Sequence, residues 1–267
     1  MNTIELKQRF AALPPDTPNV PLRHTWERHR WEIRRHVART NDASSFLKWA
    51  TIHATMFVGD VYYVHSELDI ILTWDHRDLW KEVIAETVFG AAPRLDYHSS
   101  TSGNMVHQAY HIGVWELTTG LRVRNLSNIV EFGGGYGAMA EIASRLGAKG
   151  KYTLIDFPEF SLLQKYYLSN VMLDDDLKVE YADLDNNGSD GSLLIACYSL
   201  GEVPIHVREK VLSANYNSYL IAYPDGYNSV DNNKYFRNFA EKNDHIEWTF
   251  IDKPFMPGHH YLIGKPK

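Results

Sequence analysis

The clearest pattern in the chain is a regular alternation of short apolar runs and amphipathic segments from Asn125 to the C-terminus. The apolar runs predict seven strands, at residues 128–132, 151–156, 177–182, 193–198, 216–223, 245–252 and 259–264. The intervening segments predict helices at residues 137–147, 159–172, 203–213 and 232–242. Strands that alternate with helices predict an α/β fold with a doubly wound, seven-stranded, mostly parallel sheet and right-handed crossovers.

The last two predicted strands are joined differently from the others. The segment between them, 254–258, reads Pro-Phe-Met-Pro-Gly and is too short for a helical crossover. These strands should therefore pair as antiparallel neighbours. A seven-stranded sheet that ends in such a hairpin is the methyltransferase variant of the doubly wound fold, whereas a nicotinamide-binding domain usually continues with a second βαβαβ half.

The first 120 residues predict a mostly helical region. Helical spacing of apolar residues occurs near the start of the chain and at residues 22–40, 46–57, 75–89 and 106–118. Prolines at positions 14, 15, 18 and 21 interrupt the first of these segments and predict an arm or linker.

Two further segments of this region differ in how clearly they can be interpreted. Residues 58–72 fit a helix or a strand equally. Thr73 or Asp75 can cap the helix over 75–89, and Gly90 can end it. The chain therefore divides into a helical region, 1–120, that forms a lid, an acceptor surface or a dimer surface, and a cofactor-binding domain, 121–267.

The loop after the first predicted strand points to a cofactor. It reads Glu-Phe-Gly-Gly-Gly-Tyr-Gly over residues 131–137, between a strand and a helix. Gly133, Gly135 and Ala138 satisfy the dinucleotide pattern G-x-G-x-x-G/A. The same stretch satisfies the acid-x-Gly-x-Gly-x-Gly motif of S-adenosylmethionine-dependent methyltransferases. Because the Glu131 carboxylate suits the methionine ammonium but would repel a pyrophosphate, the methyl donor is favoured over a nicotinamide cofactor.

Polar residues follow the other predicted strands, where ligands bind in such sheets. Asp156, followed by Phe157, is placed for the ribose hydroxyls, with a helix N-cap before Pro158 as the alternative. Asp183 can accept from the adenine amino group while Leu184 packs on the base; a turn residue before 185–188 is the alternative.

The fourth strand should lie closest to the transferred methyl group, and Tyr198 and Ser199 follow it. Methyl transfer to a hydroxyl needs a base, and Glu202 or His206 could supply it. The alternatives are an N-cap for Glu202 and an exposed helical position for His206. Residues 106–118 also carry candidate bases, His107 and His111. A helix there places them on one face. That face either lines the bottom of the active site or packs into the core.

Composition and charge exclude several classes of protein. A net charge of −6 and a pI near 6.1 give no reason to expect nucleic-acid binding. No uncharged apolar run approaches the roughly 20 residues that cross a bilayer, and the N-terminus lacks the apolar stretch of a signal peptide, so we expect a cytoplasmic protein without membrane insertion. The single cysteine, Cys197, excludes an internal disulfide and a thiolate zinc cluster, and it reads as a buried strand residue.

The motifs together resemble a known family. The stretches VEFGGGYGAMA, LIDFPEF, YSLGEVP and GHHYLIGKP, within residues 90–267, are similar to the bacterial sugar O-methyltransferase family of class I S-adenosylmethionine-dependent enzymes. The resemblance implies O-methylation of a free, nucleotide-linked or polymer-linked sugar in polysaccharide or natural-product biosynthesis. It also implies an acceptor at Glu202 and a cofactor site. The residues expected at that site are Glu131, Phe132, Gly133, Gly135, Tyr136, Gly137, Asp156, Phe157, Asp183, Leu184, Tyr198 and Ser199.

Other interpretations remain open from the sequence. The acceptor could be another small molecule or a protein side chain, and the chain could be a nicotinamide oxidoreductase or a binding module without activity. The absence of an Asn/Asp-Pro-Pro-Tyr motif after the fourth strand argues against methylation of nucleic-acid amines. Magnesium is not indicated, although Glu202 with Asp225 could form a site. The partners expected are a small-molecule or glycan acceptor, no nucleic acid, and a second copy of the chain in a homodimer.

Overall fold

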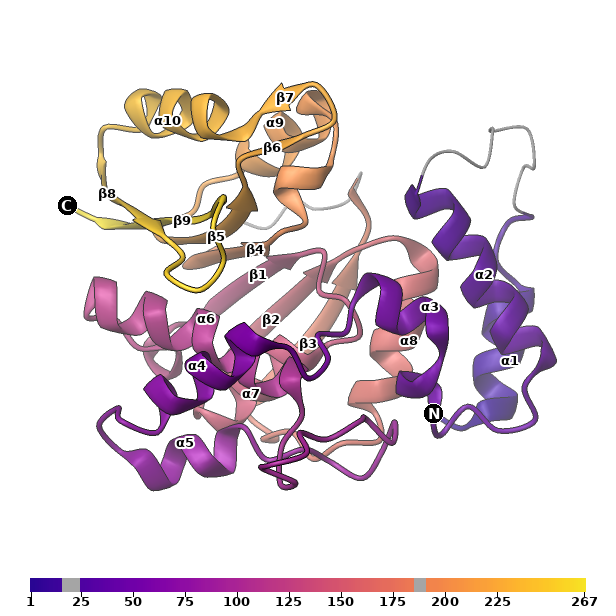
Figure 1. The fold of residues 1–267 in the computed structure, drawn as a ribbon. Coiled ribbons are helices and arrows are strands. Elements are labelled where there is room, and N and C mark those ends of the chain that lie inside the picture. Colours follow the sequence, from indigo (N-terminus) through magenta and orange to yellow (C-terminus); the bar gives the residue numbers. More distant parts are fainter. Residues whose placement is uncertain (16–24, 185–190) are drawn as a thin grey trace.

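The centre of the protein is a seven-stranded sheet, which a computed structural model describes within residues 1–15, 25–184 and 191–267 (Figure 1). Its strands are β1 (Asn128–Phe132), β2 (Gly150–Ile155), β3 (Leu177–Ala182), β4 (Leu193–Cys197), β5 (Tyr219–Pro224), β8 (Ile246–Asp252) and β9 (His259–Pro266). Their order is β3-β2-β1-β4-β5-β9-β8. The first five run parallel, and β9 is antiparallel to both β5 and β8. The predicted seven strands and the terminal hairpin are confirmed.

Strand β1 lies in the middle of the parallel part of the sheet, and both of its faces are covered. Ile129 belongs to one apolar core and Val130 to the core on the opposite face. This double burial explains why the parallel strands read as continuous apolar runs. Because the parallel strands share one direction, the loops that follow β1, β2, β3 and β4 all leave the same edge of the sheet.

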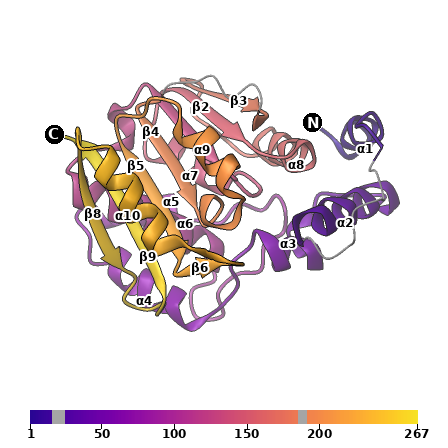
Figure 2. The ribbon, with the colours of Figure 1, turned by 90° about the horizontal axis from the view of Figure 1, so that it is seen from above.

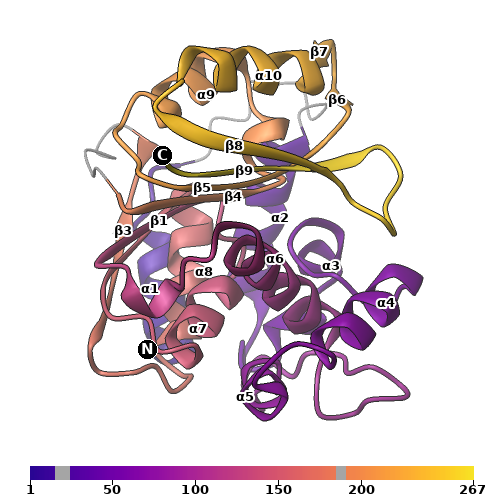
Figure 3. The same cartoon turned by 90° about the vertical axis from the view of Figure 1, so that its left-hand side faces the viewer.

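Helices cover the two faces of the sheet (Figure 3). On one face lie α6 (Gly103–Thr119), α7 (Ala138–Arg145) and α8 (Pro158–Leu168), and on the other lie α9 (Ile205–Leu212) and α10 (Asn232–Lys242). The predicted helices of the C-terminal half are confirmed within a few residues. The core on the α6 face extends into the N-terminal helices, so the sheet and the helical region share apolar packing.

The N-terminal region is helical, as predicted; the helix predicted at 106–118 is the longer α6, whereas the helices before it are shorter than predicted. The other elements are α1 (Thr3–Ala11), α2 (Thr25–Arg39), the 3-10 turn η1 (Phe46–Lys48), α3 (Ala50–Thr55), α4 (Tyr62–Ile71), α5 (Arg77–Val83) and, before β1, the 3-10 turn η2 (Val123–Asn125). Helices α1 and α2 lie beside α8, at one side of the molecule (Figure 2). The ambiguous segment 58–72 contains α4. Pro18 and Pro21 of the predicted linker lie outside the described residues.

Helix α5 corrects one prediction. It begins after His76, which has a left-handed backbone (φ 60°), and neither Thr73 nor Asp75 caps it. It ends at Val83 instead of continuing to residue 89, because the following chain is held in an irregular loop. There the Glu86 N–H donates to the Ser100 carbonyl at 2.8 Å, and the Thr101 hydroxyl donates to the Ile84 carbonyl at 2.5 Å.

Two smaller features complete the fold. A short hairpin, β6 (Gly226–Tyr227) with β7 (Val230–Asp231), precedes α10 and is absent from the sequence prediction. The 3-10 turn η4 (Leu200–Glu202) follows β4. None of the helices within the described parts of the chain is long and apolar enough to cross a membrane.

Candidate functional site

The glycine loop lies between β1 and α7 at the carboxyl edge of the sheet. Gly133, Gly135 and Gly137 have φ angles of 75°, 56° and 103°, which side-chain-bearing residues rarely adopt. A Cβ on Gly133 would lie 2.3 Å from the Ser199 Cβ. The loop therefore requires glycine both for its conformation and for its contact with the loop after β4. This geometry would let the backbone approach a ligand at the start of α7 closely.

Two acids lie at neighbouring strand ends beside this loop. Glu131 is buried in β1 and accepts a hydrogen bond from the Tyr152 hydroxyl at 2.8 Å. Burial raises the pKa of Glu131 to about 8, and the nearby charge of Asp156 adds to the rise. Asp156 follows β2 and is half-buried, and burial raises its pKa to about 7. Burial is thus the main cause that disfavours the ionised form of both carboxyl groups.

Asp156 is held in place by three donors. Its carboxylate accepts from the Phe157 N–H at 2.8 Å, from the Gln164 side-chain amide at 2.8 Å, and from the Gly134 N–H. Gln164, on α8, also donates to the Gly135 carbonyl at 3.1 Å and so ties this acid to the glycine loop. The N-cap of α8 is Phe157, so Asp156 does not have the alternative capping role. Sequence reasoning did not identify Gln164.

Three of the aromatic residues predicted for the cofactor site differ in where their side chains lie. The Tyr136 side chain is buried, with its hydroxyl accepting from the Asn104 amide at 2.9 Å, so only its backbone lies in the loop. Phe132 is in the core under α9, and its carbonyl accepts from the Ser199 hydroxyl. Phe157 is 40% exposed, and the Arg30 guanidinium lies 4.8 Å from its ring centre.

Asp183 and Leu184 leave the same edge of the sheet, directly after β3. Leu184 is partly buried against the core on the α9 face. The turn 185–188, which was the alternative interpretation for Asp183, lies outside the described residues.

The loop after β4 combines strain with buried polar groups. Tyr198 has a left-handed backbone (φ 68°), which is uncommon for a bulky residue and is often found at functional sites. Glu202 is half-buried, and burial raises its pKa. His206 is exposed on α9, as its alternative interpretation expects. Burial raises the pKa of the Cys197 thiol, which disfavours a nucleophilic thiolate.

A buried arginine fixes the course of this loop. Arg208, on α9, is fully buried and donates to the carbonyls of Val203 at 2.9 Å and Gly201 at 2.7 Å. It also donates to the Asn232 side chain at 2.7 Å, and Asn232 in turn donates to the Pro224 carbonyl at 2.9 Å. The loop that carries Glu202 is thereby tied to the start of α10.

The chain between α3 and α4 lies over the glycine loop. A Cβ on Gly135 would be 3.3 Å from the Met56 Cβ. The Val58 N–H donates to the Asn104 side chain at 3.1 Å, at the start of α6. Residues of the N-terminal region therefore form one wall of the candidate site at the glycine loop.

Five buried polar side chains form a cluster with the partly exposed Tyr198. The cluster joins α4, α6, β9 and the turn after β8, and its members are Glu67, His107, His111, Tyr198, Lys253 and Tyr261. His107 Nδ1 lies 2.8 Å and 3.0 Å from the two Glu67 oxygens, and Lys253 Nζ lies 4.0 Å from Glu67. Lys253 also donates to the Tyr198 hydroxyl at 3.0 Å. Thus two of the predicted candidate bases, His107 and His111, are brought to the end of β4.

Three members of this cluster, Glu67, Lys253 and Tyr261, were not predicted from the sequence. Glu67 occupies the apolar side of α4, among Val64, Leu68 and Ile71, and is 1% exposed. An acid at that position of the helical repeat is a signal that could have been found. Lys253 lies in the turn between the last two strands, and nothing in its local sequence indicates burial.

The predicted magnesium alternative gains no support from this geometry. Asp225 accepts from the His260 ring at 2.6 Å and from the Asn233 amide at 2.8 Å. Within the described residues, no group of three or more histidine, cysteine or acidic side chains is arranged to hold a metal ion.

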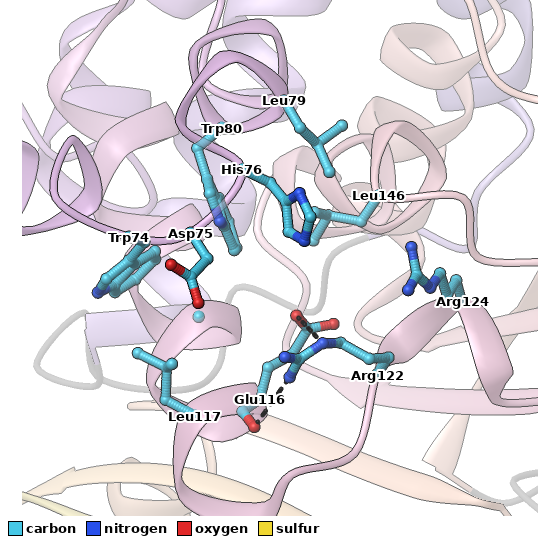
Figure 4. Close-up of a pocket in the computed structure, with 11 residues that line it drawn as sticks. Trp74, Asp75, His76, Leu79, Trp80, Glu116, Leu117, Arg122, Arg124 and Leu146 are labelled. Carbon is cyan, nitrogen blue, oxygen red and sulfur yellow. Dashed lines mark hydrogen bonds and ion pairs between the residues drawn. The ribbon is translucent and has the colours of Figure 1, made fainter.

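A hollow of about 160 Å³ lies at the opposite, amino edge of the sheet (Figure 4). It is lined by the end of α6, by α5 and by the residues before β1, including Trp74, Trp80 and Glu116. The Glu116 carboxylate accepts a hydrogen bond from the Val123 N–H at 2.9 Å and lies 3.6 Å from the Arg122 guanidinium. Since ligands of open α/β sheets bind at the carboxyl edge, we place the functional site at the glycine loop and not here.

Comparison with known proteins gives similarities of structure but not of sequence. No protein-family model matches the chain, and no curated protein sequence matches it significantly. Magnesium protoporphyrin IX methyltransferase from Synechocystis PCC 6803, with bound SAM, is 11% identical over 78% of this chain and 100% of that chain, with a TM-score of 0.45. The plantazolicin methyltransferase BpumL, in complex with a monoazolic desmethylPZN analog and SAH, is 11% identical over 77% of this chain and 97% of that chain, with a TM-score of 0.45. The methyltransferase domain of a bacterial Hen1 is 8% identical over 60% and 98%, with a TM-score of 0.46.

These similarities are too distant to transfer a substrate or the role of a residue. The strand order β3-β2-β1-β4-β5-β9-β8, with β9 antiparallel to its neighbours, is the more direct observation. By that order the chain has the fold of class I S-adenosylmethionine-dependent methyltransferases.

Proposed function

We propose that this protein is an S-adenosylmethionine-dependent O-methyltransferase and that its acceptor is a sugar hydroxyl, free, nucleotide-linked or part of a larger glycan. The observation that carries the proposal is the glycine loop between β1 and α7 with an acid at each neighbouring strand end. A nucleotide pyrophosphate would face two carboxyl groups there, whereas a cationic amino acid and a ribose would each find an acceptor.

The residues at the carboxyl edge fit the methyl donor by their chemistry. Burial raises the pKa of both Glu131 and Asp156, and the Asp156 charge adds to the rise for Glu131, so a cationic ligand would favour the ionised form of Glu131. In this proposal Glu131 would orient the methionine ammonium, Asp156 would accept from the ribose hydroxyls, and Asp183 with Leu184 would hold the adenine. When bound, the cofactor supplies an electrophilic methyl group on a sulfonium.

The surroundings of Tyr198 support an oxygen acceptor. The groups next to it are imidazoles, phenols and one acid paired with one lysine, so the cluster suits a neutral hydroxyl compound. Aromatic rings offer flat apolar surface to the faces of a sugar, and the polar tips offer hydrogen bonds to its hydroxyls. The resemblance to sugar O-methyltransferases points in the same direction.

The acceptor class is tested by transfer of a tritiated methyl group from S-adenosylmethionine. The panel contains free hexoses and deoxyhexoses, nucleotide-linked hexoses, a catechol and a lysine-rich peptide. We expect label in a sugar and not in the catechol or the peptide. Label only in the catechol or the peptide would reject the sugar proposal in favour of another small molecule or a protein side chain.

A further inference from the structure

Glu67 and His107 form a buried pair next to the loop that follows β4. Glu67 comes from α4 and His107 from α6, and they are 1% and 2% exposed. Both carboxylate oxygens lie within hydrogen-bonding distance of His107 Nδ1. Since an ionised carboxylate can only accept, Nδ1 carries the proton, and the lone pair of the neutral ring is on Nε2.

The surroundings keep this histidine in its basic form. Burial lowers the pKa of His107, and the Lys253 charge lowers it further, while Glu67 opposes both. The ring is therefore neutral at neutral pH, which is the form a general base requires. The groups that face it are Glu67 and Tyr63 from α4, His111 from its own helix, Tyr198 from the loop after β4, and Lys253 and His259 around the β8–β9 turn.

Two contacts connect the pair to the glycine loop. The His107 ring lies parallel to the Tyr198 ring, with 6.3 Å between their centres. The next residue, Ser199, packs against Gly133 of the glycine loop. His107 therefore contacts the loop after β4, and that loop in turn contacts the glycine loop.

A polar atom without a partner lies in the same place. His111 is fully buried, and its Nδ1 is 2.6 Å from the Tyr261 hydroxyl. Its Nε2 has no hydrogen-bonding partner among the described residues. A buried polar atom left unpaired costs free energy, and such atoms call for an explanation, of which a bound ligand is one. The ring centres of His107 and His111 are 4.3 Å apart, so a hydroxyl compound that reaches one is close to the other.

Two tyrosines next to the buried pair reach the protein surface in part. Tyr63 and Tyr198 are both partly exposed, and both rings lie against His107. The Tyr62 hydroxyl donates to the Phe255 carbonyl at 2.7 Å and so bridges α4 to the β8–β9 turn.

We propose that His107, oriented by Glu67, is the general base of methyl transfer, which rests on the proposed function. The acceptor hydroxyl gives its proton to His107 Nε2, and its oxygen forms a bond to the methyl carbon. The carbon–sulfur bond breaks, and its electron pair stays on sulfur as a neutral thioether. The positive charge passes from the sulfonium to the imidazolium, which returns its proton to water after the methyl ether leaves. Glu67 is a positioning residue, since it acts only through His107.

The arrangement of the pair can be measured without an acceptor. Long-range ¹⁵N–¹H spectra of the histidine rings distinguish the two neutral tautomers from the imidazolium, and His107→Gln assigns the signal. We expect His107 as the neutral Nδ1–H tautomer from pH 6.5 to 8, with a signal that shifts when S-adenosylhomocysteine binds. An Nε2–H tautomer, a charged ring, or a signal unaffected by bound S-adenosylhomocysteine would overturn the proposal.

The role in turnover is measured on the labelled acceptor found in the panel. His107→Gln should lower kcat by about 100-fold or more while the Kd for S-adenosylhomocysteine changes less than about twofold. Glu67→Gln should move the acidic limb of the pH–rate profile to lower pH, because the Glu67 charge raises the pKa of His107. A merely structural pair would alter stability but leave that limb in place, and wild-type kcat in His107→Gln would overturn the proposal.

Matched control variants distinguish these outcomes from non-specific effects of substitution. His245 and Asp69 are exposed, and Asp69 lies on the same helix as Glu67. His245→Gln and Asp69→Asn should leave kcat and the pH profile unchanged. If the wild-type protein does not bind S-adenosylhomocysteine, the proposed function fails and this inference with it. If it binds, and only the tautomer or the kcat result fails, the inference alone is overturned.

Discussion

Glu131→Gln tests whether the acid in β1 is held in a destabilising environment before the cofactor binds. The side chain is 5% exposed, and burial raises its pKa from 4.5 to about 8. A raised pKa means that the folded state binds more protons than the unfolded state between these two values. Stability should therefore be complete below about pH 4.5 and decline as pH rises towards 8.

The size of this decline follows from the two pKa values. One pKa unit corresponds to about 1.4 kcal/mol. The raised pKa of Glu131 therefore lowers the unfolding free energy by about 3 kcal/mol at pH 7 and by about 1 kcal/mol at pH 5. The uncharged glutamine keeps an oxygen that can accept from Tyr152. The substitution should therefore remove about 2 kcal/mol of the loss of stability between pH 5 and 7.

The assay is urea-induced unfolding of both proteins at several pH values in this range. The quantity of interest is the difference in unfolding free energy between wild type and Glu131→Gln, because titrating groups that do not interact with Glu131 cancel in it. Glu241 is exposed, and Glu241→Gln serves as the control with no pH-dependent difference. A difference that stays constant from pH 5 to 7 would refute the reasoning. Saturating S-adenosylhomocysteine should reduce the pH dependence of the wild type, since a cation beside Glu131 stabilises its charge.

Three other substitutions test the site in turnover or binding, and a fourth tests its framework. Asp156→Ala should weaken S-adenosylhomocysteine binding by about 1–3 kcal/mol in calorimetry, and unchanged affinity would remove the ribose assignment. Gly135→Val should abolish binding, because its Cβ would approach Met56 at 3.3 Å in a left-handed backbone; a folded variant that still binds refutes the loop assignment. Glu202→Gln should lower kcat less than His107→Gln does, and the reverse order in a labelled-methyl assay would make Glu202 the base. Arg208→Met should lower the unfolding free energy by roughly 3 kcal/mol, as two carbonyls lose a charged donor; a loss below about 1 kcal/mol would contradict that role.

Local patterns were sufficient to predict the sheet, because each of its strands and helices has a hydrophobic pattern within its own residues. Apolar runs that alternate with amphipathic segments predict the parallel strands, and the short segment 254–258 predicts the terminal hairpin. The glycine loop could be placed for the same reason, since its conformation and its neighbours in sequence are local. By contrast, the predicted end of α5 was wrong, because hydrogen bonds from residues 100 and 101 decide where that helix stops.

The acceptor side of the site depends on contacts between distant segments, which a single sequence does not reveal. His107 could be named as a candidate from its helix, but its partner Glu67 is 40 residues earlier in a segment of ambiguous pattern. Lys253 reaches the same cluster from the last hairpin. Gln164 similarly reaches the glycine loop from α8, 29 residues away. These contacts are set by tertiary packing and not by local spacing.

The central claim is that the carboxyl edge of the sheet binds S-adenosylmethionine. Calorimetric titration of the purified protein with S-adenosylhomocysteine tests it most directly, with NAD(H) as the parallel ligand. The account predicts micromolar binding of S-adenosylhomocysteine, lost in Gly135→Val, and no binding of NAD(H). Binding of NAD(H) alone would contradict the account and favour an oxidoreductase, and binding of neither ligand would contradict it in favour of a binding module without activity.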